Sequence, residues 1–120
     1  MELKLNIYAD RFCRNVERTV TANTFDLSTG ICEDVLDVVQ IDLFEGGVSA
    51  LSSESQLEIV LGMVKDGFPF FKELVKELFD ITDDEVRRTK IEDIANIVVE
   101  IVKYSFKNLV SSLGGKKAKN

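Results

Sequence analysis

The chain has 120 residues, of which 45% are hydrophobic and 30% charged, and its net charge is −6. These values indicate one folded domain, and the negative charge argues against nucleic acid or an anionic membrane as the main partner. The sequence contains no histidine, the commonest general base and metal ligand, so we expect neither an enzyme nor a metal or cofactor site. No apolar run reaches the ~20 residues that span a bilayer, and we expect a cytoplasmic protein with Cys13 and Cys32 reduced.

The first 25 residues predict a β-hairpin. Leu3, Leu5 and Ile7 alternate with polar residues, which is typical of a strand with one buried face. The segment Val16 to Phe25 alternates again and is rich in Thr and Val, so it is the expected partner strand. A two-stranded ribbon is barely stable alone in water, so it must pack on helices or pair with another copy. Its open edges could accept a strand from another subunit, although covered or charged edges are equally common.

Helices are predicted from residue 28 onward. Ser28 or Thr29 caps the first helix, which continues to a turn at Gly46-Gly47. Residues 53–56 (Ser-Glu-Ser-Gln) form a capping box that starts the second helix.

The second helix should break or kink where Gly67 and the only proline, Pro69, interrupt it. Phe68, Phe70 and Phe71 surround this proline, and a further helix follows them. If these aromatic side chains pack inside, they belong to the core. If they are exposed, they form a cluster that would dominate binding to a protein partner.

The last part of the chain predicts a short helix followed by a long one. Capping boxes at residues 82–85 and 89–92 mark two helix starts, and the long helix extends from about Lys90 to Leu113. Its polar residues occupy an arc of roughly 100° and its apolar residues roughly 220°, about twice the apolar arc of an ordinary surface helix. The pattern therefore predicts more apolar surface than one small domain covers.

The surplus apolar surface is a candidate site for self-association or for binding a client protein. The residues that we assign to it are Phe68, Phe70, Ile97, Val99, Tyr104 and Val110. Charge substitutions at these positions should abolish binding and leave the fold intact. If they unfold the protein instead, the residues belong to the core.

The patterns together predict an α+β fold that is mainly α, with an N-terminal β-hairpin followed by a bundle of about four to five helices. We expect a single domain over residues 1–115 and a flexible basic tail over residues 116–120.

Two stretches of the sequence resemble a known family. Within Glu73 to Leu109, a Phe precedes an acidic capping turn at residues 79–85, and an Arg-x-Thr-Lys-x-x-Asp step follows at residues 87–93. Thr24 to Asp42 contains an Asp-Leu-Ser start of a first helix. These features are similar to the tail assembly chaperones of long-tailed (siphovirus-type) phages and prophages of Gram-positive bacteria.

The resemblance implies a protein that binds and solubilises the tape measure protein and helps to recruit the major tail tube protein. It also implies a homo-oligomer that acts in the host cytoplasm and is absent from the mature virion. The alternative is a generic oligomeric adaptor or regulatory protein of a phage or mobile element. A tape measure gene immediately downstream would favour the chaperone, and a regulatory operon would favour the adaptor.

Overall fold

The computed structural model describes residues 1–39 and 54–111, without the side chains of residues 55, 56 and 109–111. The chain forms a two-stranded antiparallel hairpin followed by helices, which confirms the predicted α+β, mainly helical fold. The elements in chain order are β1 (Glu2–Tyr8), β2 (Val16–Asn23), the 3₁₀ turn η1 (Thr24–Asp26), α1 (Thr29–Val39), α2 (Glu54–Asp66), α3 (Phe68–Phe79), α4 (Asp83–Val86), α5 (Ile91–Ser105) and a π-helical segment (Phe106–Ser111). Within these ranges, no helix is long and apolar enough to cross a membrane.

Several parts of the sequence predictions lie outside the described residues. They include the Gly46-Gly47 turn, the Ser53 end of the capping box at residues 53–56, and the basic tail at residues 116–120.

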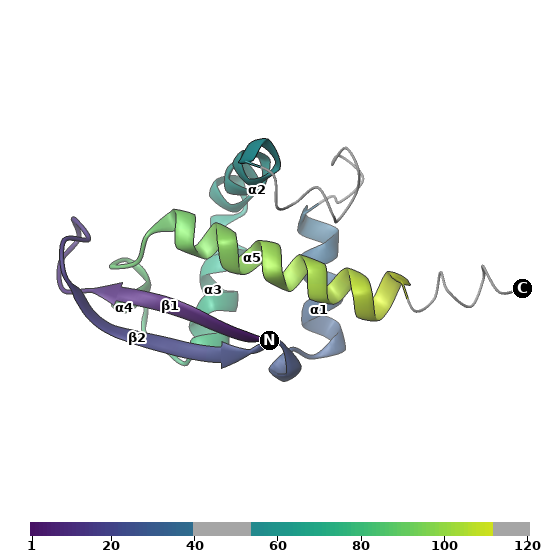
Figure 1. Cartoon of the computed structure of the whole chain (residues 1–120), viewed down its shortest axis with the longest axis horizontal. Helices are drawn as coiled ribbons and strands as arrows, with labels where there is room; N and C mark the ends of the chain where they lie inside the picture. The colour runs from purple at the N-terminus through teal and green to yellow at the C-terminus, as the bar shows by residue number, and fades with distance from the viewer. Residues whose placement is uncertain (40–53, 112–120) are drawn as a thin grey trace, which may run out of the picture.

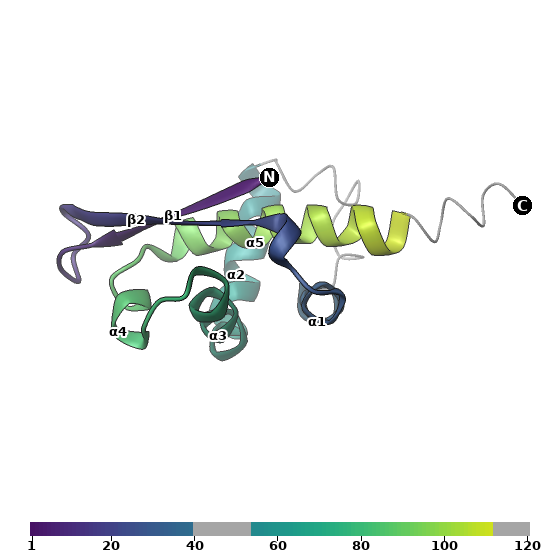
Figure 2. The ribbon, with the colours of Figure 1, turned by 90° about the horizontal axis from the view of Figure 1, so that it is seen from below.

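The elements form two layers. The hairpin and α5 lie side by side along the long axis of the molecule, and α1 and α3 lie behind them (Figure 1). Figure 2 shows the same two layers from below, with α1 and α3 on one side of the level formed by the hairpin and α5. In Figure 1, α2 lies beside α5 on the side away from the hairpin. Helix α5 therefore contacts β1, α1 and α2.

The hairpin covers the core with one face and exposes the other. Alternation in β1 turns Leu3, Leu5 and Ile7 toward the helices, and none of the three is more than 3% exposed. Strand β2 is mostly exposed, but Val20, which pairs with Leu5, is buried. The first strand therefore supplies most of the apolar surface of the sheet.

Strand β2 ends two residues earlier than the predicted Phe25. The side-chain Oδ1 of Asn23 accepts a hydrogen bond from the N–H of Phe25 at 3.1 Å, and Oδ2 of Asp26 accepts one from the N–H of Asn23 at 3.3 Å. This capping box starts the η1 turn, because Asn side chains bind nearby backbone groups in competition with a strand ladder. The turn leaves Phe25 77% exposed.

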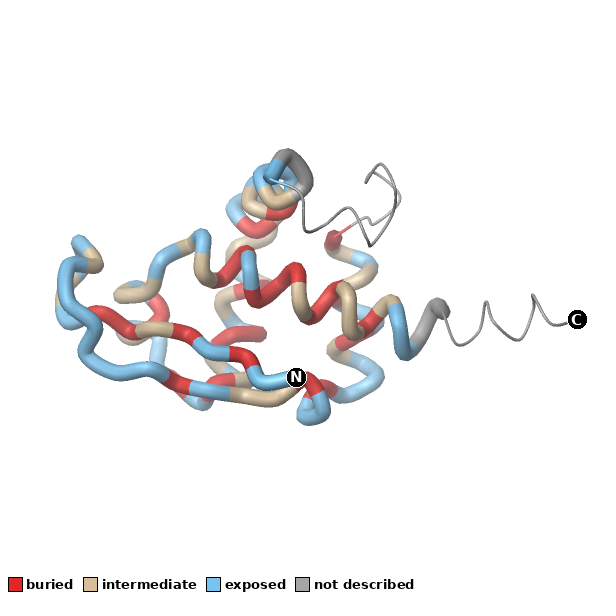
Figure 3. The backbone as a smooth tube through the Cα atoms, in the orientation of Figure 1, coloured by how far each residue is buried: buried red, intermediate tan, exposed pale blue. Residues whose placement is uncertain are grey.

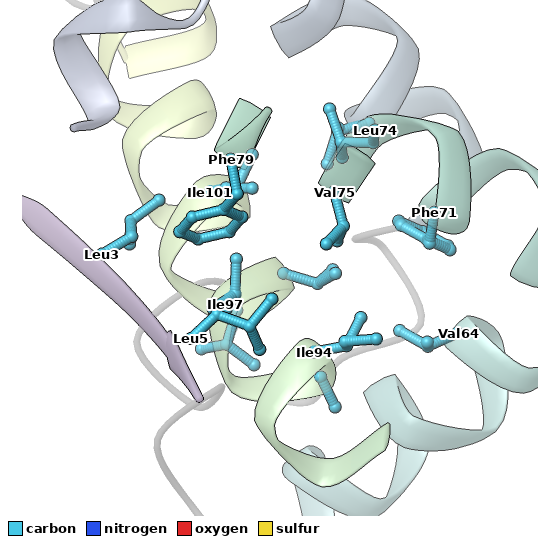
Figure 4. Close-up of a cluster of buried hydrophobic side chains, with 14 of the residues drawn as sticks. Leu3, Leu5, Val64, Phe71, Leu74, Val75, Phe79, Ile94, Ile97 and Ile101 are labelled. Carbon is cyan, nitrogen blue, oxygen red and sulfur yellow. The ribbon is translucent and has the colours of Figure 1, made fainter. Parts of the chain in front are cut away.

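The core lies between the two layers. Figure 4 shows side chains from β1, α2, α3 and α5 meeting there, among them Leu5, Val64, Phe71, Val75 and Ile101. Each of these five side chains is at most 1% exposed. Complete burial of such a side chain stabilises the fold by about 1.5–3 kcal/mol relative to exposure.

The capping box at the start of α4 is confirmed. The N–H of Glu85 donates to Oγ1 of Thr82 at 3.2 Å, and the N–H of Thr82 donates to Oε1 of Glu85 at 3.0 Å. Arg18 of β2 donates to the other carboxylate oxygen of Glu85, which ties the hairpin to α4. The hydrogen bond from Arg18, followed by that from the Thr82 N–H, lowers the pKa of Glu85 below its ordinary value.

The predicted second capping box, at residues 89–92, is wrong. Lys90 occupies the N-cap of α5 and makes no side-chain capping bond. The Thr89 hydroxyl instead donates to the carbonyl oxygen of Val86 at 2.7 Å, which closes the end of the preceding short helix. Thr89 thus bonds to the end of α4 and lies one residue before the N-cap of α5.

The long helix ends its regular α-helical part at Ser105, and the predicted end at Leu113 lies outside the described residues. The side-chain Nδ2 of Asn108 donates to the carbonyl oxygen of Tyr104 at 2.8 Å. In an α-helix that carbonyl would accept from the backbone N–H of Asn108. The side chain thus competes with the α-helical ladder where the π-helical segment forms.

Candidate protein-binding groove

The five assigned residues whose side chains the structure describes do not lie on one surface. Ile97 and Val99 are only 4% and 5% exposed, which corrects the prediction that they are available to another chain. The reason is that β1, α1 and α2 all pack on α5 and cover most of its apolar circumference. Figure 3 shows buried residues along most of α5, and Figure 4 places Ile97 in the same cluster as Leu5.

Three of the other assigned residues have described side chains, and these lie at two separate places. Phe68 and Phe70 at the start of α3 are half-buried against the core. Tyr104 is half-buried near the end of α5, where its ring meets the exposed ring of Phe25 edge to face at a centroid distance of 6.3 Å. The side chain of Val110 lies outside the described part of the chain.

Phe70 lines a groove between α1 and α3, and we call this feature the α1–α3 groove. Its volume is about 310 Å³. The lining residues are Ile31, Asp34, Pro69, Phe70, Glu73, Leu74 and Glu77. The groove therefore combines four apolar side chains with three carboxylates.

The break between α2 and α3 positions one wall of this groove. The predicted break is confirmed, because α2 ends at Asp66, Gly67 is the N-cap of α3, and Pro69 lies in the first turn. Proline is tolerated there because the first helical N–H groups have no partner within the helix. The proline ring is consequently presented on the surface at the start of α3, beside Phe70.

Gly67 also permits α1 to approach this break closely. A Cβ atom on Gly67 would lie 3.5 Å from Cγ1 of Val38 on α1 and 3.4 Å from a ring carbon of Phe71. These are ordinary van der Waals distances, so a Cβ atom would fit at this position, whereas a longer side chain would meet Val38 and Phe71.

Phe70 is positioned by its neighbour in the sequence. The ring of Phe71 is fully buried and meets the ring of Phe70 edge to face, with centroids 5.1 Å apart and an interplanar angle of 82°. Such pairs prefer this geometry because the positive ring edge meets the negative ring face. Phe70 therefore presents one side of its ring at a defined place in the groove.

The charged side chains around the groove are all acidic. Lys76 lies 3.4 Å from a carboxylate oxygen of Glu73, but Lys76 also pairs with Asp83 at 3.8 Å. Among the described residues, Asp34 and Glu77 have no ion-pair partner. The groove thus favours a ligand with an apolar surface flanked by cationic groups.

A larger groove of about 740 Å³ lies between the outer face of the hairpin and α5. Eight of its eleven lining residues are polar or charged, and they carry both signs of charge, with Lys4 paired to Glu2 at 3.8 Å. Burial raises the pKa of Asp93, while Lys90 acts in the opposite direction. Most residues that line this groove are polar or charged, whereas apolar residues are the majority in the α1–α3 groove, so the larger groove is a weaker candidate for binding the apolar face of a protein helix.

The sequence analysis missed most of the α1–α3 groove. Ile31 and Leu74 fall on the apolar faces of their helices in the sequence, but these faces alone do not indicate which helices become neighbours. The available signal was Pro69, because a proline in the first turn of a helix often lies at the surface together with the residues next to it.

Comparison with known proteins identified no relative of this chain: no protein-family model matched it, and neither the curated proteins nor the solved structures gave a match.

Proposed function

We propose that this protein is a tail assembly chaperone that binds helical segments of a tape measure protein in the α1–α3 groove. The observation that carries the proposal is the combination of an apolar floor with an entirely acidic rim in one groove between two helices. The sequence resemblance to tail assembly chaperones supplies the identity of the client. Recruitment of the major tail tube protein and action in the host cytoplasm belong to the same proposal and rest on that resemblance alone.

The chemistry of the groove matches an amphipathic helix as its ligand. Such a helix presents apolar side chains at spacings of three and four residues, and these can contact Ile31, Phe70 and Leu74. Lys or Arg side chains beside the apolar stripe would face Asp34 and Glu77. The apolar contacts supply affinity, while the charges select basic helices over acidic ones.

Co-expression with a phage tape measure protein tests the proposal. The informative variant is Asp34→Lys/Glu77→Lys, because both side chains are exposed and the substitution reverses the charge of the rim. We expect the wild type to keep the client soluble and to co-purify with it, and the variant to lose both activities. Far-UV circular dichroism should show that the variant remains folded.

A matched control is Glu2→Lys/Glu33→Lys, which changes the net charge equally at exposed positions outside the groove. The control should behave like the wild type. Equal loss of solubilisation in both double variants would show that net charge matters and the groove does not. Failure of the wild type to solubilise the client would overturn the proposal and favour the adaptor alternative.

A further inference from the structure

The two outer edges of the hairpin differ in whether other parts of the chain bond to them or lie beside them. At the edge of β1, the N–H of Tyr8 donates to the carbonyl oxygen of Arg88 at 2.8 Å, and Nη1 of Arg88 donates to the carbonyl oxygen of Tyr8 at 2.6 Å. Helix α5 also lies beside this strand (Figure 1). The edge of β2 has no element beside it in the view of Figure 2.

The register identifies which backbone groups of β2 point outward. The N–H of Thr24 donates to the carbonyl oxygen of Met1, and hydrogen-bonded pairs in an antiparallel ladder occur at every second residue. Arg18, Val20 and Ala22 therefore bond to β1. The backbone groups of Thr19 and Thr21 point away, and within the described ranges they bond to no other backbone group.

This edge lacks the usual features that prevent strand pairing. Strand β2 contains no proline or lysine, and its segment from Thr19 to Asn23 carries no charge. Large exposed apolar side chains lie at both ends of the strand. Phe12 and Val16 at the hairpin-tip end are 72% and 51% exposed, and Phe25 at the other end is 77% exposed.

We propose that two copies of this chain pair through β2, antiparallel and with Val20 on the two-fold axis, to form a continuous four-stranded sheet. In this register Thr19 of each copy lies opposite Thr21 of the other, so the two outward pairs exchange four backbone hydrogen bonds. The bulge near Tyr8, opposite Val16, limits regular pairing at the tip end, so the interface is centred on Val20.

The distribution of exposed side chains identifies the occupant as a second copy. A two-fold axis at Val20 brings the tip end of one β2, with Phe12 and Val16, next to Phe25 of the other copy. Both exposed apolar ends are therefore covered at once by the same symmetric pairing. No like charges face each other, because Glu17 lies opposite Asn23 and Arg18 opposite Ala22 in this register.

Sedimentation of the full chain tests the pairing. We expect a reversible dimer at concentrations of tens to hundreds of micromolar. Thr21→Pro removes an outward N–H without removing a bond to β1, so it should reduce the dimer association constant at least tenfold. Thr21→Val keeps the N–H and should still form the dimer. A wild type that stays monomeric throughout this range, or Thr21→Pro that dimerises like the wild type, would overturn the proposal.

A second pair of variants keeps the test valid if the proline disturbs folding. Thr19→Lys/Thr21→Lys places two positive charges on the β2 edge of each copy, so four positive charges would meet across the interface. Because these charges repel each other, the variant should be monomeric, and its circular dichroism spectrum should match that of the wild type. A folded lysine variant that dimerises as strongly as the wild type would also overturn the proposal.

Disulfide formation tests the register. In a Cys13→Ser background, a mixture of Thr19→Cys and Thr21→Cys proteins should form a mixed disulfide dimer, since Cα atoms of directly opposite residues lie about 5.5 Å apart. Cys32 is only 4% exposed and should not interfere. Each cysteine variant alone should crosslink far less, because its two copies are displaced along the strands. Efficient crosslinking of Thr21→Cys alone would overturn the assigned register.

Discussion

The loss of folding stability on replacing Ile97 by alanine tests whether the apolar face of α5 is buried by its own domain or is exposed to another chain. Ile97 is 4% exposed, whereas Ile59 on α2 is 39% exposed, so Ile59→Ala provides a control with the same chemical change. If α5 is covered by its own domain, the first substitution should destabilise the fold strongly and the second only weakly.

The expected magnitude follows from burial. Ile→Ala removes three carbon atoms, and at about 0.8 kcal/mol each the lost transfer free energy is about 2.4 kcal/mol at a buried site. The cavity left behind raises the total to about 3–4 kcal/mol for Ile97→Ala. At Ile59 the partial exposure and the higher helix propensity of alanine should keep the cost below about 1.5 kcal/mol.

Urea denaturation followed by far-UV circular dichroism measures both values. For a domain of this size, the cost at Ile97 corresponds to a decrease in Tm of roughly 10–15 °C. A cost at Ile97 no greater than that at Ile59 would refute the assignment of Ile97 to the core. Ile97 would then be exposed on the surface, as the sequence pattern of the helix predicted.

Two further predictions concern hydrogen bonds at helix starts. Ser28→Ala should cost about 1 kcal/mol in urea denaturation, because Oγ of Ser28 accepts a hydrogen bond from the N–H of Ile31 at 3.2 Å. Thr29→Ala at the neighbouring exposed position should stay within about 0.5 kcal/mol, and equal costs would contradict the choice of Ser28 as the cap. The folded-state pKa of Glu85 lies below its ordinary value of 4.5, chiefly because Arg18 donates a hydrogen bond to its carboxylate. The ionised carboxylate therefore stabilises the fold above pH 4.5, and this stabilisation is lost as the pH falls through the folded-state pKa. The Tm of the wild type should therefore fall as the pH drops below about 4.5, and the Tm of Glu85→Gln should fall less over the same range. If both proteins lose Tm equally, the contact of Glu85 with Arg18 does not stabilise the fold.

Local patterns predicted much of the fold because their causes lie within a few residues. The alternation of Leu3, Leu5 and Ile7 predicted a strand with one buried face, and Thr82 with Glu85 predicted the start of α4. The failed second capping box shows the limit of such patterns. Thr89 has the right spacing, but its hydroxyl bonds back to the preceding turn, and the motif alone does not distinguish the two geometries.

The coverage of α5 could not be predicted from its own sequence. The helical wheel gives the width of the apolar arc, but the number of neighbours that cover it depends on how distant segments pack. Here β1, α1 and α2 converge on the same helix, so Ile97 and Val99 are buried. The α1–α3 groove was missed for the same reason, since Ile31 and Phe70 belong to helices whose contact no local pattern indicates.

The most direct test of the proposed binding groove is an NMR titration of the methyl-labelled protein with a synthetic basic amphipathic helical peptide. The account predicts that the largest shift changes occur at the methyl groups of Ile31 and Leu74, and that high salt weakens them because carboxylates form the rim. Shift changes confined to Leu57 and Leu61, which line a separate hollow between α2 and α5, would contradict it. So would the absence of any change at millimolar peptide.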